Sequence, residues 1–331
     1  MSNTAAIFGC EGLTLSPKEA AFFRAVDPAG FILFGRNIET PTQLLALTTS
    51  LRDAVGWNAP ILIDQEGGRV ERMSAPHWRI WQPMLDEMQR AGVQAGRIAY
   101  LRNRIIAHDL QAVGIDVNCA PCADIAHDDT HAVLRNRCCG FDAKTVIENA
   151  RQVARGLLDG GVLPVLKHIP GHGRATLDSH KDLPHVGADF DTLQETDFAV
   201  FRALNDCPMG MSAHIVFDAI DPNAPATTSA KMMGVIRTEI GFEGLLMSDD
   251  ISMEALNGTI EIRAQAALRA GCDVVLHCNG TLTEMEKIAQ NCPKLSEISK
   301  KRLNLALDQR ISPSETSREA LEFELERLTT H

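Results

Sequence analysis

Three histidines and one lysine are concentrated in residues 167–180, a segment with the composition of a catalytic loop. Residues 167–173 read Lys-His-Ile-Pro-Gly-His-Gly, and Asp178 and His180 follow shortly afterwards. The two glycines and the proline predict a loop rather than a helix. Because Asp178 and His180 are two positions apart, the carboxylate can fold onto the imidazole, orient the ring and favour its charged form. A histidine held in this way can donate a proton and later accept one near neutral pH.

Two adjacent carboxylates, Asp249 and Asp250, follow the apolar run at residues 244–247. Neighbouring residues of a strand point in different directions, so only one of the two can face a shared site. That carboxylate is a candidate nucleophile or electrostatic stabiliser. The other could cap the following segment, residues 251–256.

Polar residues near the ends of two further apolar stretches are candidates for binding a substrate. Asp64 follows residues 61–63 and opens a Gly-Gly-containing segment that ends at Arg72. A carboxylate at this position can accept hydrogen bonds from two neighbouring hydroxyl groups, as sugars require. Arg137 lies in a polar loop, and its guanidinium group could form paired hydrogen bonds with vicinal hydroxyls or with a carboxylate.

The histidine cluster also allows a metal site. The candidate ligands are His168, His172, His180 and His185, together with Asp178. Their spacings fit no single helical face, and the sequence contains no His-Glu-x-x-His motif. Acid–base chemistry is therefore favoured over metal binding, and no metal is expected.

Eight short apolar runs along the chain predict the strands that must position these groups. The runs are continuous rather than alternating, which is typical of strands covered on both faces in a parallel sheet. They lie at residues 5–10, 30–34, 60–63, 115–120, 162–166, 209–216, 244–247 and 272–277.

Helical patterns lie between the apolar runs. Ser16 and Pro17 with Glu19 form a capping box with proline at the first helical position, and Thr40 with Pro41 begins another helix in the same way. An apolar stripe over residues 146–158 ends at two glycines that can take the left-handed turn. Further helices are expected at residues 193–204, 231–240, 262–270 and 298–307.

Strand followed by helix, repeated about eight times, predicts a closed (β/α)8 barrel of the TIM type. The alternative is an open doubly wound sheet, but no Gly-rich nucleotide-binding signature follows the first strand. Without a composition break, residues 1–331 are expected to form a single catalytic domain with a helical C-terminal tail from about residue 293. In such a barrel the active site lies where the strands end, so the candidate groups are expected to share one site.

Composition narrows the partners and the compartment. The 331 residues include 32 Lys and Arg against 43 Asp and Glu, a net charge of -11 that disfavours nucleic acid and anionic membranes. No apolar stretch is long enough to span a membrane, and no basic segment precedes the first apolar run as in a secretory signal. Nine scattered cysteines, including an isolated Cys-x-x-Cys at Cys119 and Cys122, predict reduced thiols and a cytoplasmic protein.

These motifs, in this order, resemble the family-3 glycoside hydrolases, and most closely the single-domain bacterial β-N-acetylglucosaminidases (β-hexosaminidases) of peptidoglycan recycling. The resemblance covers nearly the whole chain. The sequence departs from the family pattern at Ile169, where phenylalanine is usual, and at Cys138 and Cys139. The matching stretches are residues 64–70, 167–173, 178–180, 211–215 and 248–253.

The resemblance implies the roles of individual residues. Asp249 would be the nucleophile of a retaining hydrolase, His180 the general acid/base, and Asp178 the partner of His180. The N-acetylglucosamine unit would be bound by Asp64, Arg72, Arg137, Lys167 and His168. The implied substrate is a recycled muropeptide, in which N-acetylglucosamine is linked to anhydro-N-acetylmuramic acid. No cofactor and no obligate protein partner are expected.

Composition and chemistry leave some alternatives open. Aromatic residues make up only 5%, which favours a short pocket for a terminal sugar over a long cleft lined with stacking rings. A neutral imidazole repels an incoming anion less than a carboxylate does, so phosphorolysis is a secondary possibility beside hydrolysis. The competing functions are a metal-dependent amidohydrolase on the same barrel and a sugar-binding barrel that has lost its chemistry.

Overall fold

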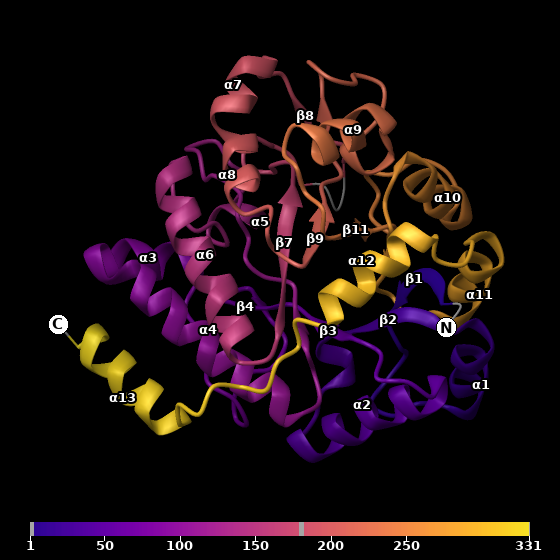
Figure 1. Ribbon diagram of the computed structural model, residues 1–331, viewed down its shortest axis with the longest axis horizontal. Coiled ribbons are helices and arrows are strands. Elements are labelled where there is room, and N and C mark those ends of the chain that lie inside the picture. The colour runs from indigo at the N-terminus through magenta and orange to yellow at the C-terminus, as the bar shows by residue number, and fades with distance from the viewer. Residues whose placement is uncertain (1–2, 179–181, 331) are drawn as a thin grey trace.

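The eight apolar runs form eight parallel strands that close into a barrel (Figure 1). The computed structural model describes residues 3–178 and 182–330. The barrel strands are β1 (Thr4–Phe8), β2 (Pro28–Leu33), β3 (Ile61–Ile63), β6 (Val117–Asn118), β7 (Leu163–Ile169), β9 (Met209–Ser212), β11 (Leu245–Asp250) and β12 (Val274–His277). Around the barrel they follow the order β1-β12-β11-β9-β7-β6-β3-β2, with β1 and β2 also paired. The predicted (β/α)8 barrel is confirmed.

The helices surround this barrel, and several begin where their caps predicted. Ser16 Oγ accepts a hydrogen bond from the Glu19 amide, and the Glu19 carboxylate accepts one from the Ser16 amide, which completes the predicted capping box. The helices are α1 (Pro17–Val26), α2 (Pro41–Val55), α3 (Met84–Ala91), α4 (Ala95–Ala112), α5 (Ala132–Arg135), α6 (Ala143–Asp159), α7 (Phe190–Glu195), α8 (Asp197–Ala203), α9 (Ala230–Thr238), α10 (Ile260–Ala270), α11 (Leu282–Asn291), α12 (Glu297–Leu307) and α13 (Arg318–Thr329).

The single helix predicted over residues 193–204 is wrong, because the chain breaks there into α7 and α8. Thr196 lies between them with φ -118° and ψ -88°, outside the helical region. Its hydroxyl donates to the Thr192 carbonyl, and Asp197 accepts from the Arg174 guanidinium. Side-chain hydrogen bonds of this kind compete with the helical ladder and interrupt it.

The barrel interior is filled by apolar side chains from alternate strand positions, as a closed barrel requires. Leu303 and Ala306 of α12 pack against this interior cluster. The Leu295 amide, just before α12, donates to the Asn3 carbonyl at the start of β1, so α12 covers the end of the barrel where the strands begin. The interior strand residues are Ile7, Ala29, Ile32, Leu62, Val117, Cys119, Leu163, Val165, Met209, Met211, Leu245, Met247, Val274 and Leu276.

The remaining segments cover the outside and the rim of the barrel. Leu321 and Leu325 of α13 are buried, and α13 is tied to α4 by an ion pair between Arg97 and Glu324 at 2.7 Å. Two small sheets lie outside the barrel order: β4 (Gln65–Gly67) with β5 (Val70–Glu71), and β8 (His185–Val186) with β10 (Val216–Phe217). Within residues 3–178 and 182–330, every helix is too short or too polar to cross a bilayer.

Candidate active site

The inward-facing rows of strand side chains end in charged residues at the rim where the strands finish. On β7 the row that contains Val165 continues to Lys167, and on β11 the row that contains Met247 continues to Asp249. Asp64 follows β3 at the next inward position after Leu62. Because side chains two residues apart share one face of a strand, the apolar filling of the barrel gives way to a ring of polar groups.

The start of the predicted loop at Lys167 is wrong. Lys167 and His168 belong to β7, which runs to Ile169 and pairs there with Ser212 of β9. The glycines and the proline that suggested a loop lie beyond the end of this strand. Lys167 is therefore held by the barrel, with only 1% of its surface exposed.

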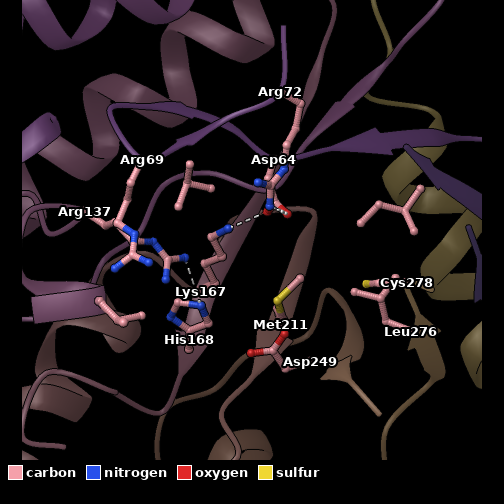
Figure 2. Close-up of a pocket in the computed structure, with 13 residues that line it drawn as sticks. Asp64, Arg69, Arg72, Arg137, Lys167, His168, Met211, Asp249, Leu276 and Cys278 are labelled. Atoms are coloured by element: carbon pink, nitrogen blue, oxygen red, sulfur yellow. Dashed lines mark hydrogen bonds and ion pairs between the residues drawn. The ribbon is translucent and has the colours of Figure 1, made fainter. Parts of the chain in front are cut away.

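A cavity of about 220 Å³ opens at this rim (Figure 2). It is smaller than the roughly 300–1,000 Å³ of most ligand pockets, which suits one small ring. The six residues Asp64, Arg72, Arg137, Lys167, His168 and Asp249, all named from the sequence, line it together with Ile32, Arg69, Val70, Val133, Met211, Leu276 and Cys278. Six of the eight site residues named from the sequence therefore line one cavity, whereas Arg69, which is also charged and lines it, was not among those named.

Charged pairs hold most of the cations around the cavity. Lys167 Nζ lies 2.9 Å from Asp64 Oδ1, and Arg72 Nη2 lies 3.2 Å from Asp64 Oδ2. Lys167 Nζ also lies 2.6 Å from Glu66 Oε1. Arg137 donates from Nε and Nη2 to the two oxygens of Glu66, both at 2.9 Å. Burial opposes the charge of Asp64, but Lys167 and Arg72 outweigh it and lower the pKa of Asp64 below its usual range.

Glu66 joins the two halves of this network, and sequence reasoning did not single it out. Its side chain is buried and its pKa is lowered: burial opposes the charge, but Arg137 and Lys167 outweigh that penalty. Glu66 lies two residues after Asp64, inside the same motif. The alternation of strand side chains was the signal that could have placed both carboxylates toward the site.

A second pair, His168 with Asp124, lies at the inner side of the cavity. His168 Nδ1 is 2.8 Å from Asp124 Oδ2, and Asp124 Oδ1 accepts a hydrogen bond of 2.6 Å from the His172 amide. Burial opposes the charged imidazole, but the Asp124 carboxylate outweighs it and raises the pKa of His168 to about 9. His168 is therefore a cation at neutral pH, with its Nε2 3.4 Å from Arg137 Nη2.

This pair predicts a pH dependence of folding stability. A group whose pKa rises on folding stabilises the protein fully below its unfolded pKa, and that stabilisation is lost as pH rises through the folded value. We expect the free energy of unfolding to fall by on the order of 2 kcal/mol between about pH 6.5 and pH 8.5 because of His168, as measured by urea denaturation. In His168→Gln this slope should be largely absent. Equal slopes in the two proteins would contradict the assignment.

Asp249 and Asp250 have different surroundings. Asp249 lines the cavity, and its Oδ1 accepts a 2.8 Å hydrogen bond from the Asp250 amide. Burial opposes its charge, but His168 and His214 outweigh the penalty, so the pKa of Asp249 is lowered and the carboxylate is ionised. Asp250 instead accepts hydrogen bonds from the Ser252 hydroxyl at 2.6 Å and amide at 3.1 Å. Of the two, Asp249 faces the cavity.

Asp250 caps a turn rather than a helix. Residues 251–256 form successive turns, and Asp250 satisfies the amide of Ser252 at their start. It also accepts a 3.3 Å hydrogen bond from the Cys278 amide. The second carboxylate thus caps residues 251–256 as predicted, but these residues form turns and not a helix.

The predicted acid/base pair is described only in part. Asp178 lines a small second cavity that it shares with Asp249, His168 and His172. His180 lies outside the described residues, as do its two neighbours. The burial of His172 lowers its pKa to about 4, so this ring is neutral at physiological pH.

The proposed metal ligands do not come together among the residues that the structure describes. His168 and His172 are in contact, with ring centroids 5.4 Å apart, but His185 is exposed and pairs with Asp218 at 2.9 Å. A different group, Cys122, Asp124 and His168, has ligand atoms within 4.8 Å of one another. Asp124 and His168 are, however, hydrogen-bonded to each other. All nine cysteines are free thiols.

Comparison with known proteins agrees with this geometry. The model of the Glycosyl hydrolase family 3 N terminal domain matches residues 15–312. The chain belongs to glycosyl hydrolase family 3. A beta-hexosaminidase of Alkalilimnicola ehrlichii is 36% identical over 280 residues, which are 82% of this chain and 80% of the relative. A beta-hexosaminidase of Methylobacillus flagellatus is 37% identical over 278 residues, 81% of this chain and 78% of the relative.

Solved structures of family 3 have the same fold. NagZ from Neisseria gonorrhoeae, in complex with N-trifluoroacetyl-D-glucosamine, superposes with a TM-score of 0.84 at 28% identity, covering 100% of this chain and 97% of that one. A family-3 β-N-acetylglucosaminidase from Paenibacillus sp. str. FPU-7 gives 0.87 at 28% identity, covering 98% of this chain and 66% of that longer one. The chain is accordingly a glycoside hydrolase of family 3, and the relatives that it matches are β-hexosaminidases. The predicted family resemblance is confirmed.

Proposed function

We propose that this family-3 enzyme is a retaining exo-β-N-acetylglucosaminidase that works through a covalent glycosyl-aspartate. The proposed substrate is a recycled muropeptide, from which it removes the terminal β-linked N-acetylglucosamine next to anhydro-N-acetylmuramic acid. The observation that carries the proposal is the partly buried, ionised Asp249 carboxylate on the wall of a small cavity lined by charged groups.

The proposed binding groups are Asp64, Arg72, Arg137, Lys167 and His168, which line the cavity. Asp64 is ionised and acceptor-only, so it can accept from sugar hydroxyls while Lys167 and Arg72 fix its orientation. The cations donate to sugar oxygens. Because each is already held by a carboxylate, little side-chain entropy is lost when the sugar binds.

In the first step, an Asp249 oxygen forms a bond to the anomeric carbon while the glycosidic C–O bond breaks. The leaving oxygen takes a proton from the His180 imidazolium, which Asp178 is proposed to orient and keep charged. The product is an ester between Asp249 and the sugar. Nearby His168, a cation, keeps the Asp249 carboxylate ionised before the attack.

In the second step, water attacks the anomeric carbon and the ester bond to Asp249 breaks. The now neutral His180 accepts the water proton, so both residues return to their starting states. Two displacements at one carbon give net retention of configuration. In many glycosidases the distance between two catalytic carboxyl groups predicts whether configuration is retained or inverted. That relation does not apply to Asp249 and Asp178, because the His180 imidazole, not Asp178, is proposed to transfer the proton.

The substrate preference rests on the size of the cavity and on the family. A cavity of about 220 Å³ suits a single terminal sugar, which favours exo cleavage. The related NagZ was solved with an N-acylated glucosamine, which supports N-acetylglucosamine as the sugar that this enzyme recognises. The cytoplasmic location and the absence of a cofactor or obligate partner stay predictions.

Trapping tests the covalent intermediate directly. A 2-fluoro glycoside with a good leaving group should glycosylate the enzyme, add one sugar mass, and label the peptide that contains Asp249 and Asp250. Fragmentation of that peptide should place the label on Asp249. A label on Asp250, or turnover with no trapped species and an inverted product, would contradict the mechanism.

Comparison of turnover with and without inorganic phosphate separates hydrolysis from phosphorolysis. Hydrolysis, which we expect, releases free N-acetylglucosamine at a rate independent of phosphate. Formation of a sugar 1-phosphate with a rate that rises with phosphate would replace water by phosphate in the second step.

A further inference from the structure

Arg69 differs from the other cations around the cavity because it has no partner among residues 3–178 and 182–330. Arg72, Arg137 and Lys167 each contact a carboxylate of the site. The Arg69 guanidinium lines the same cavity but makes no hydrogen bond or ion pair with any residue in the described ranges (Figure 2). In a protein with a net charge of -11, an unpaired cation at the active site is a feature that needs an explanation.

The backbone beneath Arg69 is held firmly in place. Arg69 is at the tip of the β4–β5 hairpin, directly after Gly67 and Gly68, whose φ angles are +103° and +61°. A Cβ at Gly67 would collide with Arg102 and Trp81 behind the hairpin. The Gly68 amide donates to the Trp81 carbonyl at 2.8 Å. The close packing at the back fixes the tip, so Arg69 extends from a rigid support.

Arg69 is also the most accessible of the four cations. Lys167 and Arg137 are buried, with 2% and 11% of their side-chain surface exposed, and Arg72 keeps 27%. Arg69 is exposed. The cavity has room for about one sugar, so Arg69 at the rim is placed to meet the next unit of the substrate rather than the sugar being cleaved. Val70 and Val133 also line the cavity and add an apolar surface.

We propose that Arg69 is a specificity-determining residue that binds a carboxylate on the leaving part of the substrate. The enzyme would then prefer N-acetylglucosaminides with an acidic aglycone over neutral ones. This inference rests on the proposed function, because it assumes that N-acetylglucosamine occupies the cavity. The protein is negatively charged overall, so an anionic substrate must be attracted by a local cation. The Arg69 guanidinium offers paired donors to a carboxylate, and no acid in the described residues pairs with it.

A matched pair of synthetic substrates tests the inference. The 4-carboxyphenyl β-N-acetylglucosaminide and its methyl ester differ in charge and by only one methyl group. We expect Arg69→Gln to lower the acid-to-ester ratio of kcat/KM by about fivefold, the upper end of the range for an exposed contact between charged groups. Arg69→Lys should keep most of the ratio. Added salt should lower it in the wild type and not in Arg69→Gln.

Arg79→Gln is the matched control. Arg79 is a nearby exposed arginine that stacks on Trp81, at 4.8 Å from the ring centroid, and does not line the cavity. The Arg79→Gln substitution removes the same charge from the same region, so the acid-to-ester ratio of this variant should equal that of the wild type. An unchanged ratio in Arg69→Gln, or an equal fall in both variants, would overturn the inference.

A binding measurement tests the role of Arg69 independently of the proposed hydrolytic function. The corresponding thioglycosides are not cleaved, so calorimetry gives their Kd values without turnover. Failure to hydrolyse either oxygen glycoside would overturn the proposed function, while a fivefold loss of acid preference in Kd would still support the role of Arg69. Rapid hydrolysis with equal Kd ratios in wild type and Arg69→Gln would overturn the role of Arg69 alone.

A second set of substrates identifies the source of the carboxylate. In a muropeptide it could be the lactyl carboxylate of the muramic acid or a carboxylate of the attached peptide. The disaccharide with a free lactyl group, its methyl amide and its peptide-bearing form separate these sources. The source is the form whose kcat/KM falls most in Arg69→Gln; equal effects on all three, including the neutral amide, would overturn the inference.

Discussion

Asp249→Ala should lose turnover by on the order of 10⁴-fold or more in kcat for an aryl N-acetylglucosaminide, with the fold left intact. The carboxylate is the only group proposed to bond to the anomeric carbon, and water cannot replace it at the same position and orientation. The charges of His168 and His214 outweigh the burial penalty and lower the pKa of Asp249, so the carboxylate is ionised in the folded protein, as a nucleophile must be. Steady-state rates and circular dichroism measure the two parts of this result.

Azide supplies a second readout for the same variant. A small anion can enter the space left by the Asp249 side chain and attack the anomeric carbon of an activated substrate. We expect azide to restore part of the rate in Asp249→Ala and to give a glycosyl azide of inverted configuration. A general structural defect would not be rescued in this way.

Asp250→Asn is the matched control for Asp249→Ala. Asp250 accepts hydrogen bonds from Ser252 and from the Cys278 amide, so its loss should lower stability by about 1–3 kcal/mol. Its effect on turnover should be far smaller than that of Asp249→Ala. Near-normal activity in Asp249→Ala, or loss of the trapped intermediate only in Asp250→Asn, would refute the assignment of the nucleophile.

The strands of the barrel could be predicted from the sequence because their apolar runs are a local signal. Strands covered on both faces need apolar residues at every position, and all eight runs became barrel strands. The candidate groups could also be predicted, since a parallel barrel brings every strand end to one rim. Asp64 and Lys167 are 103 residues apart in the sequence, yet both line the same cavity as Asp249.

The carboxylates that hold the cations could not be predicted in the same way. Glu66 and Asp124 became important through contacts with Arg137 and His168, which lie 71 and 44 residues away. The local pattern does not show which cation either carboxylate contacts. Their roles depend on the register and curvature of the barrel, which set which side chains meet.

Helix α4 shows a further limit of the pattern. It is buried along most of its length but contains Arg102 and Arg104, whose side chains are fully buried. Arg102 contacts Glu87 and the Glu66 carbonyl. Charged residues in a buried helix weaken the apolar stripe from which a helix is predicted. The tertiary contacts that hold Arg102 cannot be seen in the local sequence pattern.

Glu66→Gln should have the second largest effect, on stability and on substrate binding together. Glu66 is buried and is the only carboxylate within ion-pair distance of both Arg137 and Lys167 in the described part of the chain. Glutamine has the same shape but no charge, so two buried cations lose a shared counter-charge. Removing one partner of a buried ion pair costs about 3–5 kcal/mol. We expect this loss in urea unfolding, with KM raised at least about tenfold by the misplaced cations.

The pH dependence separates this role from a simple packing defect. Arg137 and Lys167 outweigh the burial of Glu66 and lower its pKa, so its contribution is present above the unfolded pKa and is lost as pH falls through the folded value. The gap in unfolding free energy between wild type and Glu66→Gln should therefore narrow on acidification. Glu71→Gln is the control, since Glu71 belongs to the same hairpin but, among the residues that the structure describes, accepts a hydrogen bond only from the Trp81 amide. A constant gap at all pH values, or an equal loss in Glu71→Gln, would show that the Glu66 charge does not hold the site together.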